Sequence, residues 1–159
     1  MKNNAILSKI TQALQFDVPH IKSIFAAVEI ELSDKEINNL LKTEYEPQFE
    51  ALPDYVLVLF LNSLIDTYRG KKEGVEPEPV ANTIKISSND VLKKLRIAFS
   101  LQEQDVRDAL KLVTIELTKS DLAALFRKAG HAQYKACEDE LLLDFIEGLG
   151  LLLRQRQES

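Results

Sequence analysis

The chain has 159 residues, of which 45% are hydrophobic and 28% are charged, and its net charge is −5. This composition excludes a disordered or fibrous chain, and the length suits one ordinary domain or two small ones. The single cysteine excludes an intramolecular disulfide, and no apolar run is long enough to span a bilayer. We therefore expect a cytoplasmic protein that has no membrane partner.

The sequence repeats itself at a constant offset of 85 residues, as from Ile6 to Val91. Residues near 4–69 align with residues near 89–154 without a gap. A fixed period of this kind means that each copy is one structural unit. Because a copy of roughly 66 residues is near the size at which a lone core becomes marginal, we expect the two copies to pack against each other.

Each copy begins with a pattern typical of an amphipathic helix. Ile6, Ile10 and Leu14 fall on one stripe of a period of about 3.6 residues, and the second copy repeats this stripe. Asn4 and Asn89 stand where an N-cap is expected, because an asparagine side chain can accept a hydrogen bond from the free amides of a helix start.

Three further helices are predicted in each copy. The third begins with a capping box at residues 33–36, in which a serine and a glutamate bond each other's backbone amides. Thr118 and Asp121 predict a similar capping box in the second copy, in which the shorter aspartate side chain replaces glutamate. The fourth helix is the longest and begins at Asp54 or at Asp139. The sequence thus predicts an all-α protein of two tandem homologous four-helix units, related by internal duplication and packed about a pseudo-twofold axis.

A linker separates the two copies, because residues 70–79 mix glycine, proline and charge in a way that disfavours a packed helix. The predicted organisation is a first helical repeat over 1–69, a linker over 70–87 and a second helical repeat over 88–159. The first repeat has six Lys/Arg against ten Asp/Glu, and the second has eleven against twelve. The acidic first repeat argues against a nucleic-acid footprint spread over both copies.

Three stretches of the chain resemble the YehS-like family of bacterial proteins. They are residues 69–74 (Arg-Gly-Lys-Lys-Glu-Gly), 89–98 and 124–131, with Tyr134 and Cys137 after the last. The resemblance covers nearly the whole chain. It implies a bacterial cytoplasmic protein with two copies of a small helical domain of unknown function and no assigned activity. Leu52 replaces a cysteine that the resemblance leads us to expect in the first copy.

One segment of the second copy carries residue types that are used in catalysis. A thiol and an imidazole, here Cys137 and His131, can form a nucleophile–base pair or half of a zinc site. Their spacing matches no Cys/His metal pattern, and the first copy has neither residue type there. We interpret the segment as a packing turn, with a regulatory thiol and a catalytic pair as alternatives. No phosphate-binding or nucleophile motif occurs, so we predict no catalytic residue, metal or cofactor.

Polar residues that are identical in both copies provide a second set of candidates. Lys9 with Lys94, and Glu31 with Glu116, have no local explanation. One interpretation is an ion pair between Lys9 and Glu31, and between Lys94 and Glu116, which ties the first helix to the loop before the third. The other interpretation is a repeated contact site. The candidate partner contacts are Lys9, Glu31, Lys94, Glu116, Arg127, Lys128 and His131.

The first three helices of each copy have the outline of a helix-turn-helix unit, in which the third helix would read nucleic acid. In the second copy this helix would present cations able to contact phosphates. These cations and their possible neighbours are Lys119, Arg127, Lys128, Lys93, Lys94 and Arg96. The acids on the same turns and the acidic net charge disfavour this use.

Our main functional expectation is a non-catalytic helical interaction or adaptor protein. Its partner would be an unidentified protein or a second copy of the chain, docked on apolar faces left over on the long helices. The alternative is a nucleic-acid-binding regulator that uses the helix-turn-helix-like unit of the second repeat. A third hypothesis is an enzyme whose site lies between the repeats, which predicts a polar interface pocket containing groups with perturbed pKa values.

Overall fold

The computed structural model describes residues 1–158, which form eight helices joined by irregular segments. The first repeat contains α1 (Asn3–Ala13), α2 (Val18–Ala26), α3 (Asp34–Leu40) and α4 (Asp54–Tyr68). The second contains α5 (Ser88–Ala98), α6 (Glu103–Leu112), α7 (Lys119–Leu125) and α8 (Asp139–Glu158). The predicted all-α fold of two four-helix units is confirmed over the described residues. None of these helices is long and apolar enough to cross a membrane.

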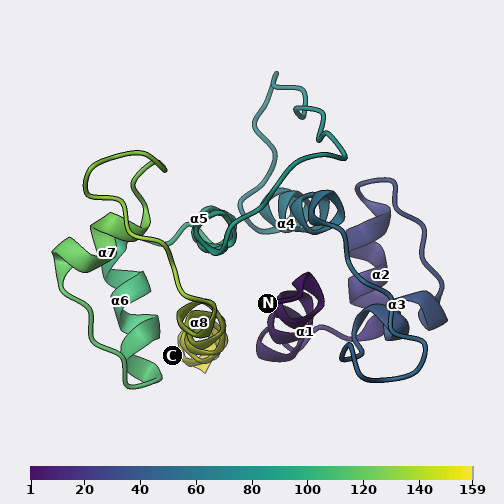
Figure 1. Ribbon diagram of the computed structural model, residues 1–159, viewed down its shortest axis with the longest axis horizontal. Coiled ribbons are helices and arrows are strands. Elements are labelled where there is room, and N and C mark those ends of the chain that lie inside the picture. Colours follow the sequence, from purple (N-terminus) through teal and green to yellow (C-terminus); the bar gives the residue numbers. More distant parts are fainter. Residues whose placement is uncertain (159) are drawn as a thin grey trace.

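The first and last helices of the two repeats form the centre of the molecule. Figure 1 shows α1, α4, α5 and α8 in the middle, with α2 and α3 at one end and α6 and α7 at the other. α1 packs more extensively on α8 than on α4, and α5 packs more extensively on α4 than on α8. Each repeat therefore packs its first helix on the last helix of the other repeat, and one buried apolar cluster runs through both.

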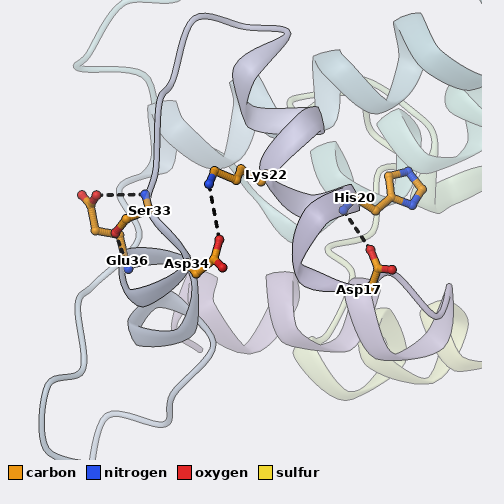
Figure 2. Close-up of polar contacts among 6 residues, drawn as sticks. All are labelled: Asp17, His20, Lys22, Ser33, Asp34 and Glu36. Carbon is orange, nitrogen blue, oxygen red and sulfur yellow. Dashed lines mark hydrogen bonds and ion pairs between the residues drawn. The ribbon is translucent and has the colours of Figure 1, made fainter.

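Side chains fix the start of α3 and tie it to α2 (Figure 2). Ser33 Oγ accepts a hydrogen bond from the amide of Glu36 (3.1 Å), and Glu36 Oε1 accepts one from the amide of Ser33 (3.0 Å). The predicted capping box is thus present, and its bond from the Ser33 amide lowers the pKa of Glu36. Lys22 Nζ donates to Asp34 Oδ1 at 3.4 Å, which joins α2 to the first turn of α3.

The predicted N-cap roles of Asn4 and Asn89 are wrong. Lys2 and Ser87 occupy the N-cap positions of α1 and α5, and both asparagines lie inside the helices with buried side chains. The prediction failed because it assumed that a polar residue at a helix start caps that same helix. The side chains instead reach inward to a different part of the repeat.

Asn4 fastens the segment between α3 and α4 to α1. Its Nδ2 donates to the carbonyls of Leu40 (2.8 Å) and Glu50 (2.7 Å), and its Oδ1 accepts from the amide of Leu52 (2.9 Å). Buried amides and carbonyls need such partners, because an unsatisfied one costs about 1–3 kcal/mol. One side chain thus satisfies three backbone groups and sets the path of this segment.

Asn89 makes the same bonds in the second repeat. Its Nδ2 donates to the carbonyls of Leu125 and Lys135, both at 2.9 Å, and its Oδ1 accepts from the amide of Cys137 (2.8 Å). Each partner lies 85 residues after its counterpart in the first repeat. A fourth bond is added here, because the hydroxyl of Tyr134 donates to Asn89 Oδ1 at 3.0 Å.

Two glycines let α8 pack directly against the backbones of its neighbours. A Cβ atom added at Gly148 would overlap the carbonyl oxygen of Ala109 on α6, and one at Gly150 would overlap the backbone of α1. The first repeat has Ser63 at the position equivalent to Gly148, and its Oγ donates to the carbonyl of Ile24 at 2.7 Å. The α6–α8 contact is therefore backbone to backbone, whereas α2 and α4 meet through a side chain.

Candidate functional site

The duplicated lysines lie at the two seams where the repeats meet. Lys9 Nζ on α1 forms a salt bridge with Glu147 on α8 (2.8 Å), and Lys94 Nζ on α5 donates to Asn62 Oδ1 on α4 (2.7 Å). Positions 62 and 147 are related by the same 85-residue offset, so the two contacts are equivalent. Burial lowers the pKa of Lys94, which has a neutral partner, and the bond from Lys9 lowers the pKa of Glu147.

The predicted ion pairs of Lys9 with Glu31 and of Lys94 with Glu116 are wrong. Both glutamates are exposed, and neither forms a salt bridge within the part of the chain that the structure describes. The lysines serve the contact between repeats, which no pairing within one copy could reveal. Their conservation between the copies therefore has a structural explanation.

Carboxylates at the starts of the last helices also join the repeats. Asp54 accepts hydrogen bonds from Asn3 Nδ2 (2.7 Å) and from the amide of Ile86 (3.0 Å), near the end of the linker that leads to the second repeat. These bonds, led by that from Asn3, lower the pKa of Asp54. Asp139 Oδ2 lies 3.3 Å from the amino nitrogen of Met1, at the position equivalent to Ile86. The predicted helix starts at Asp54 and Asp139 are confirmed.

The structure does not bring His131 and Cys137 into a catalytic pair. Cys137 is buried, and burial together with Asp139 and Glu138 raises the pKa of its thiol to about 11. His131 is exposed, and its Nδ1 accepts from the amide of Gln133 at 3.0 Å. A thiol of this kind stays protonated at neutral pH, which favours the packing-turn interpretation. Among residues 1–158, no three His, Cys, Asp or Glu side chains are grouped to hold a metal ion.

A groove of about 480 Å³ opens in the second repeat between the start of α5 and the segment that follows α7. It brings together two of the predicted contact residues, Arg127 and Lys128, with further cations and two aromatic rings. We call it the basic groove. Its charged and aromatic lining residues are Lys85, Asp90, Lys93, Phe126, Arg127, Lys128 and Tyr134.

Positive charge dominates the basic groove. Its four cationic side chains are all exposed, and none forms a salt bridge with another residue of the described chain. A single acidic residue, Asp90, lines the groove beside these four cations, and its carboxylate accepts from the amide of Ser87 at 2.9 Å in the capping box of α5. The groove therefore offers several free cations to an anionic ligand.

The two aromatic rings of the basic groove are held in place. The guanidinium carbon of Arg96 lies 4.6 Å from the centroid of the Phe126 ring, and Arg96 Nε donates to the carbonyl of Leu101 at 3.0 Å. The hydroxyl of Tyr134 is fixed by its bond to Asn89. Both rings are half-buried, so each keeps part of its surface accessible.

The first repeat has a groove of about 370 Å³ at the equivalent place, with a different lining. We call it the apolar groove; its hydrophobic and aromatic lining residues are Ala5, Leu41, Tyr45, Phe49 and Leu143. Tyr45 is 89% exposed. Ser8 and Thr43 stand where the basic groove has Lys93 and Lys128. Two of the lysines of the apolar groove form salt bridges with glutamates.

The helix-turn-helix outline is present only in part. Residues 113–118 separate α6 from α7, a longer connection than the turn of about three or four residues in such units. α7 has seven residues, and its Leu122 and Leu125 are buried. Arg127 and Lys128 follow this helix rather than lie on it. The cations of the second repeat thus line a groove and do not form an exposed reading helix.

Arg127 and Lys128 are among the contact residues predicted from the sequence, whereas Lys85, Phe126 and Tyr134 are not. The differences between the two copies could have indicated these residues of the basic groove. The aligned positions in the first repeat carry Leu and Phe where the second has Phe126 and Tyr134. The identical polar positions, such as Lys9 with Lys94, instead hold the fold together.

Comparison with known proteins identifies the family. The family model described as "Protein of unknown function (DUF1456)" matches residues 3–70 and again residues 88–155. The chain is 35% identical over 152 residues to the "Uncharacterized protein YehS" of Escherichia coli (strain K12), with 94% of each chain covered. No solved structure matches. The resemblance found in the sequence is thus confirmed, and the chain belongs to the DUF1456 family, whose domain it carries twice.

Proposed function

We propose that this protein is a non-catalytic binding protein and that the basic groove of its second repeat binds nucleic acid. The observation that supports the proposal most directly is the set of four lining cations without a salt-bridge partner among the described residues. Lysine and arginine side chains that neutralise phosphates release the condensed counterions, which provides most of the affinity in non-specific binding.

The acidic net charge does not oppose this use of the second repeat. Most of the charge excess lies in the first repeat, where ten Asp/Glu face six Lys/Arg, whereas the second is nearly balanced. Exposed charges further apart than a Debye length, about 8 Å at physiological salt, are largely screened from one another. The local charge of the groove therefore matters more to a ligand than the total.

A cytoplasmic location is part of the proposal. The single cysteine, Cys137, is buried and free, as suits a reducing compartment in which structural disulfides are rare. A nucleic acid in the same compartment would be accessible to the exposed groove. Fractionation of cells that produce the tagged protein tests this part, and recovery with the periplasmic fraction would contradict it.

Fluorescence anisotropy with a labelled oligonucleotide tests nucleic-acid binding directly. We expect binding at low salt that weakens steeply as salt rises. The double variant Lys93→Ser/Lys128→Thr installs the residues of the first repeat and should bind more weakly, with a salt slope reduced by about 2. The matched control Lys35→Ser/Lys72→Thr makes the same charge change outside the groove. Absence of binding at low salt, or an equal loss in the control, would disprove the proposal.

A second candidate function is the docking of a protein partner, or of a second copy of the chain, in the apolar groove. The observation that favours it is the 89% exposure of Tyr45 beside a largely hydrophobic lining. Sedimentation over a range of concentrations tests self-association. If the groove mediates it, Tyr45→Ser should dissociate the dimer. A monomer at all concentrations would leave only a different protein as partner.

A further inference from the structure

We infer, on the basis of the proposed function, that the ligand of the basic groove is a single-stranded nucleic acid, one base of which stacks on Phe126. Binding to phosphates alone requires no aromatic ring, yet Phe126 and Tyr134 both line the groove. Unpaired bases stack on aromatic side chains, and each such contact contributes about 1–3 kcal/mol to binding. The combination of cations and rings fits a strand that presents both phosphates and free base faces.

Phe126 is half-buried and lines both the basic groove and a neighbouring hollow. Arg96 lies over the ring and lines the adjoining hollow of about 320 Å³, but it is not part of the lining of the basic groove. The guanidinium therefore contacts the ring from outside the lining of the basic groove. Because its Nε is also bonded to the carbonyl of Leu101, the stack of cation and ring is ordered before a ligand arrives. Preorganisation of this kind lowers the entropic cost of binding.

The cations flank the rings from two different segments of the chain. Lys85 precedes α5 and Lys93 lies on it, whereas Arg127 and Lys128 belong to the segment after α7. A strand lying between these two segments can direct its phosphates to the cations and a base to Phe126. The first repeat, which has Leu41 and Ser8 at the positions of Phe126 and Lys93, cannot provide the same contacts.

A duplex fits the groove poorly. Bases in a duplex already stack on one another, so an aromatic side chain can stack on one only after it is unpaired. Proteins that read duplex DNA place an exposed helix or ribbon in a major groove about 12 Å wide. Here α7 is short and turns Leu122 and Leu125 into the core, and the cations line a concave surface.

The test compares three probes by fluorescence anisotropy with the full chain. They are an oligothymidylate of about 12 nucleotides, within the span of small single-strand-binding modules, its duplex with oligoadenylate, and an abasic strand of equal length and charge. We expect the oligothymidylate to bind most tightly. The abasic strand should bind at least roughly fivefold more weakly, because it retains the phosphates and lacks the stacking base.

Variants of the protein locate the stacking residue. Phe126→Leu installs the residue of the first repeat at that position and should weaken oligothymidylate binding at least roughly fivefold, with an unchanged salt slope. Phe99→Leu is the matched control, because Phe99 is also half-buried and Leu14 stands at its equivalent position. It should leave binding unchanged. Circular dichroism melts confirm that both variants fold.

The outcomes separate this inference from the proposed function. Equal affinity for all three probes, or no effect of Phe126→Leu, would overturn the single-strand inference. If Lys93→Ser/Lys128→Thr still weakened binding in that case, nucleic-acid binding itself would stand. Loss of binding to every probe at low salt would overturn both. The comparison with the abasic strand uses the wild-type protein, so it decides the question even if Phe126→Leu fails to fold.

Discussion

The two repeats share one fold, but their third helices begin with different charges. In the first repeat, Lys22 on α2 forms a salt bridge with Asp34 at the start of α3, at 3.4 Å (Figure 2). The equivalent positions in the second repeat hold Arg107 and Lys119. A pair of opposite charges in one copy is therefore a pair of cations in the other, and Arg107 borders a hollow of about 340 Å³ together with a further cation, Lys111.

Comparison of the two repeats separates positions that stabilise the fold from positions available to a ligand. The contacts kept in both repeats are internal: the buried asparagines fasten the segments before the last helices, and the duplicated lysines join the repeats. Some of the positions that differ lie at the surface, as where Lys93 and Lys128 replace Ser8 and Thr43. Divergence between the copies is thus the better guide to the candidate site in this chain.

The largest effect should come from removal of the buried asparagines. Asn4→Ala leaves two carbonyls and one amide without their partner, and Asn89→Ala leaves the hydroxyl of Tyr134 without one as well. Each unsatisfied buried group costs about 1–3 kcal/mol. We expect each variant to lower the free energy of unfolding by about 3 kcal/mol, allowing for partial access of water. Urea denaturation followed by circular dichroism measures this change.

The ratio of the two losses in the free energy of unfolding, for Asn4→Ala and for Asn89→Ala, tests whether the two repeats depend equally on their buried asparagines. Asn38→Ala on the exposed face of α3 is the matched control and should change stability little. Asn89→Ala should also weaken nucleic-acid binding, because Asn89 fixes Tyr134 in the basic groove, whereas Asn4→Ala should not. A small loss at Asn4 beside a large one at Asn89 would show that the two repeats do not depend equally on this clamp.

An exchange of small residues between the repeats should have the next largest effect. Gly148→Ser copies Ser63 into α8, where the new side chain would overlap the backbone of α6. We expect a loss of about 1–3 kcal/mol, typical of overpacking. The reciprocal Ser63→Gly removes the hydrogen bond to Ile24 and adds a helix-interior glycine, with an expected loss of about 1–2 kcal/mol. Thermal melts that show no cost for Gly148→Ser would mean that α8 can move away from α6 freely.

Much of the fold was predictable because the sequence patterns that determine each helix involve residues close together in the chain. The apolar stripes, the capping box at Ser33 and Glu36, and the starts of the last helices at Asp54 and Asp139 follow from residues near one another in sequence. The duplication supplied a second copy of each signal. The packing of α1 on α8 and of α5 on α4 could not be obtained in this way, because both copies are equally compatible with pairing inside a repeat.

The candidate site was less predictable than the fold, because its residues come from parts of the chain that are far apart in the sequence. Lys85 lies in the segment before α5, and only the folded chain places it beside Arg127 and Lys128. Phe126 reads as a core residue by its helical spacing, although it lies just past the end of α7 and lines two hollows. Sequence spacing gives no distance between segments, so a site built from three segments becomes visible only in the structure.

The smallest expected effect concerns the two seams between the repeats, which differ in one ionisable group. Lys9 pairs with a carboxylate, Glu147, whereas Lys94 is bonded to the neutral amide of Asn62. The bond from Lys9 lowers the pKa of Glu147 in the folded protein. Its stabilisation is therefore present above the ordinary glutamate pKa and is lost as the pH falls through the lowered folded value.

Glu147→Gln makes the two seams alike and should remove this pH dependence. At neutral pH we expect a loss of at most about 1 kcal/mol, because both partners are partly exposed. Urea denaturation of wild type and variant should converge as the pH falls below the folded pKa of Glu147. The matched variant Asn62→Asp would place an ionisable pair in the α4–α5 seam and add acid sensitivity there. If Glu147→Gln kept the full acid sensitivity of the wild type, that sensitivity would come from other carboxylates with a lowered pKa, such as Asp54.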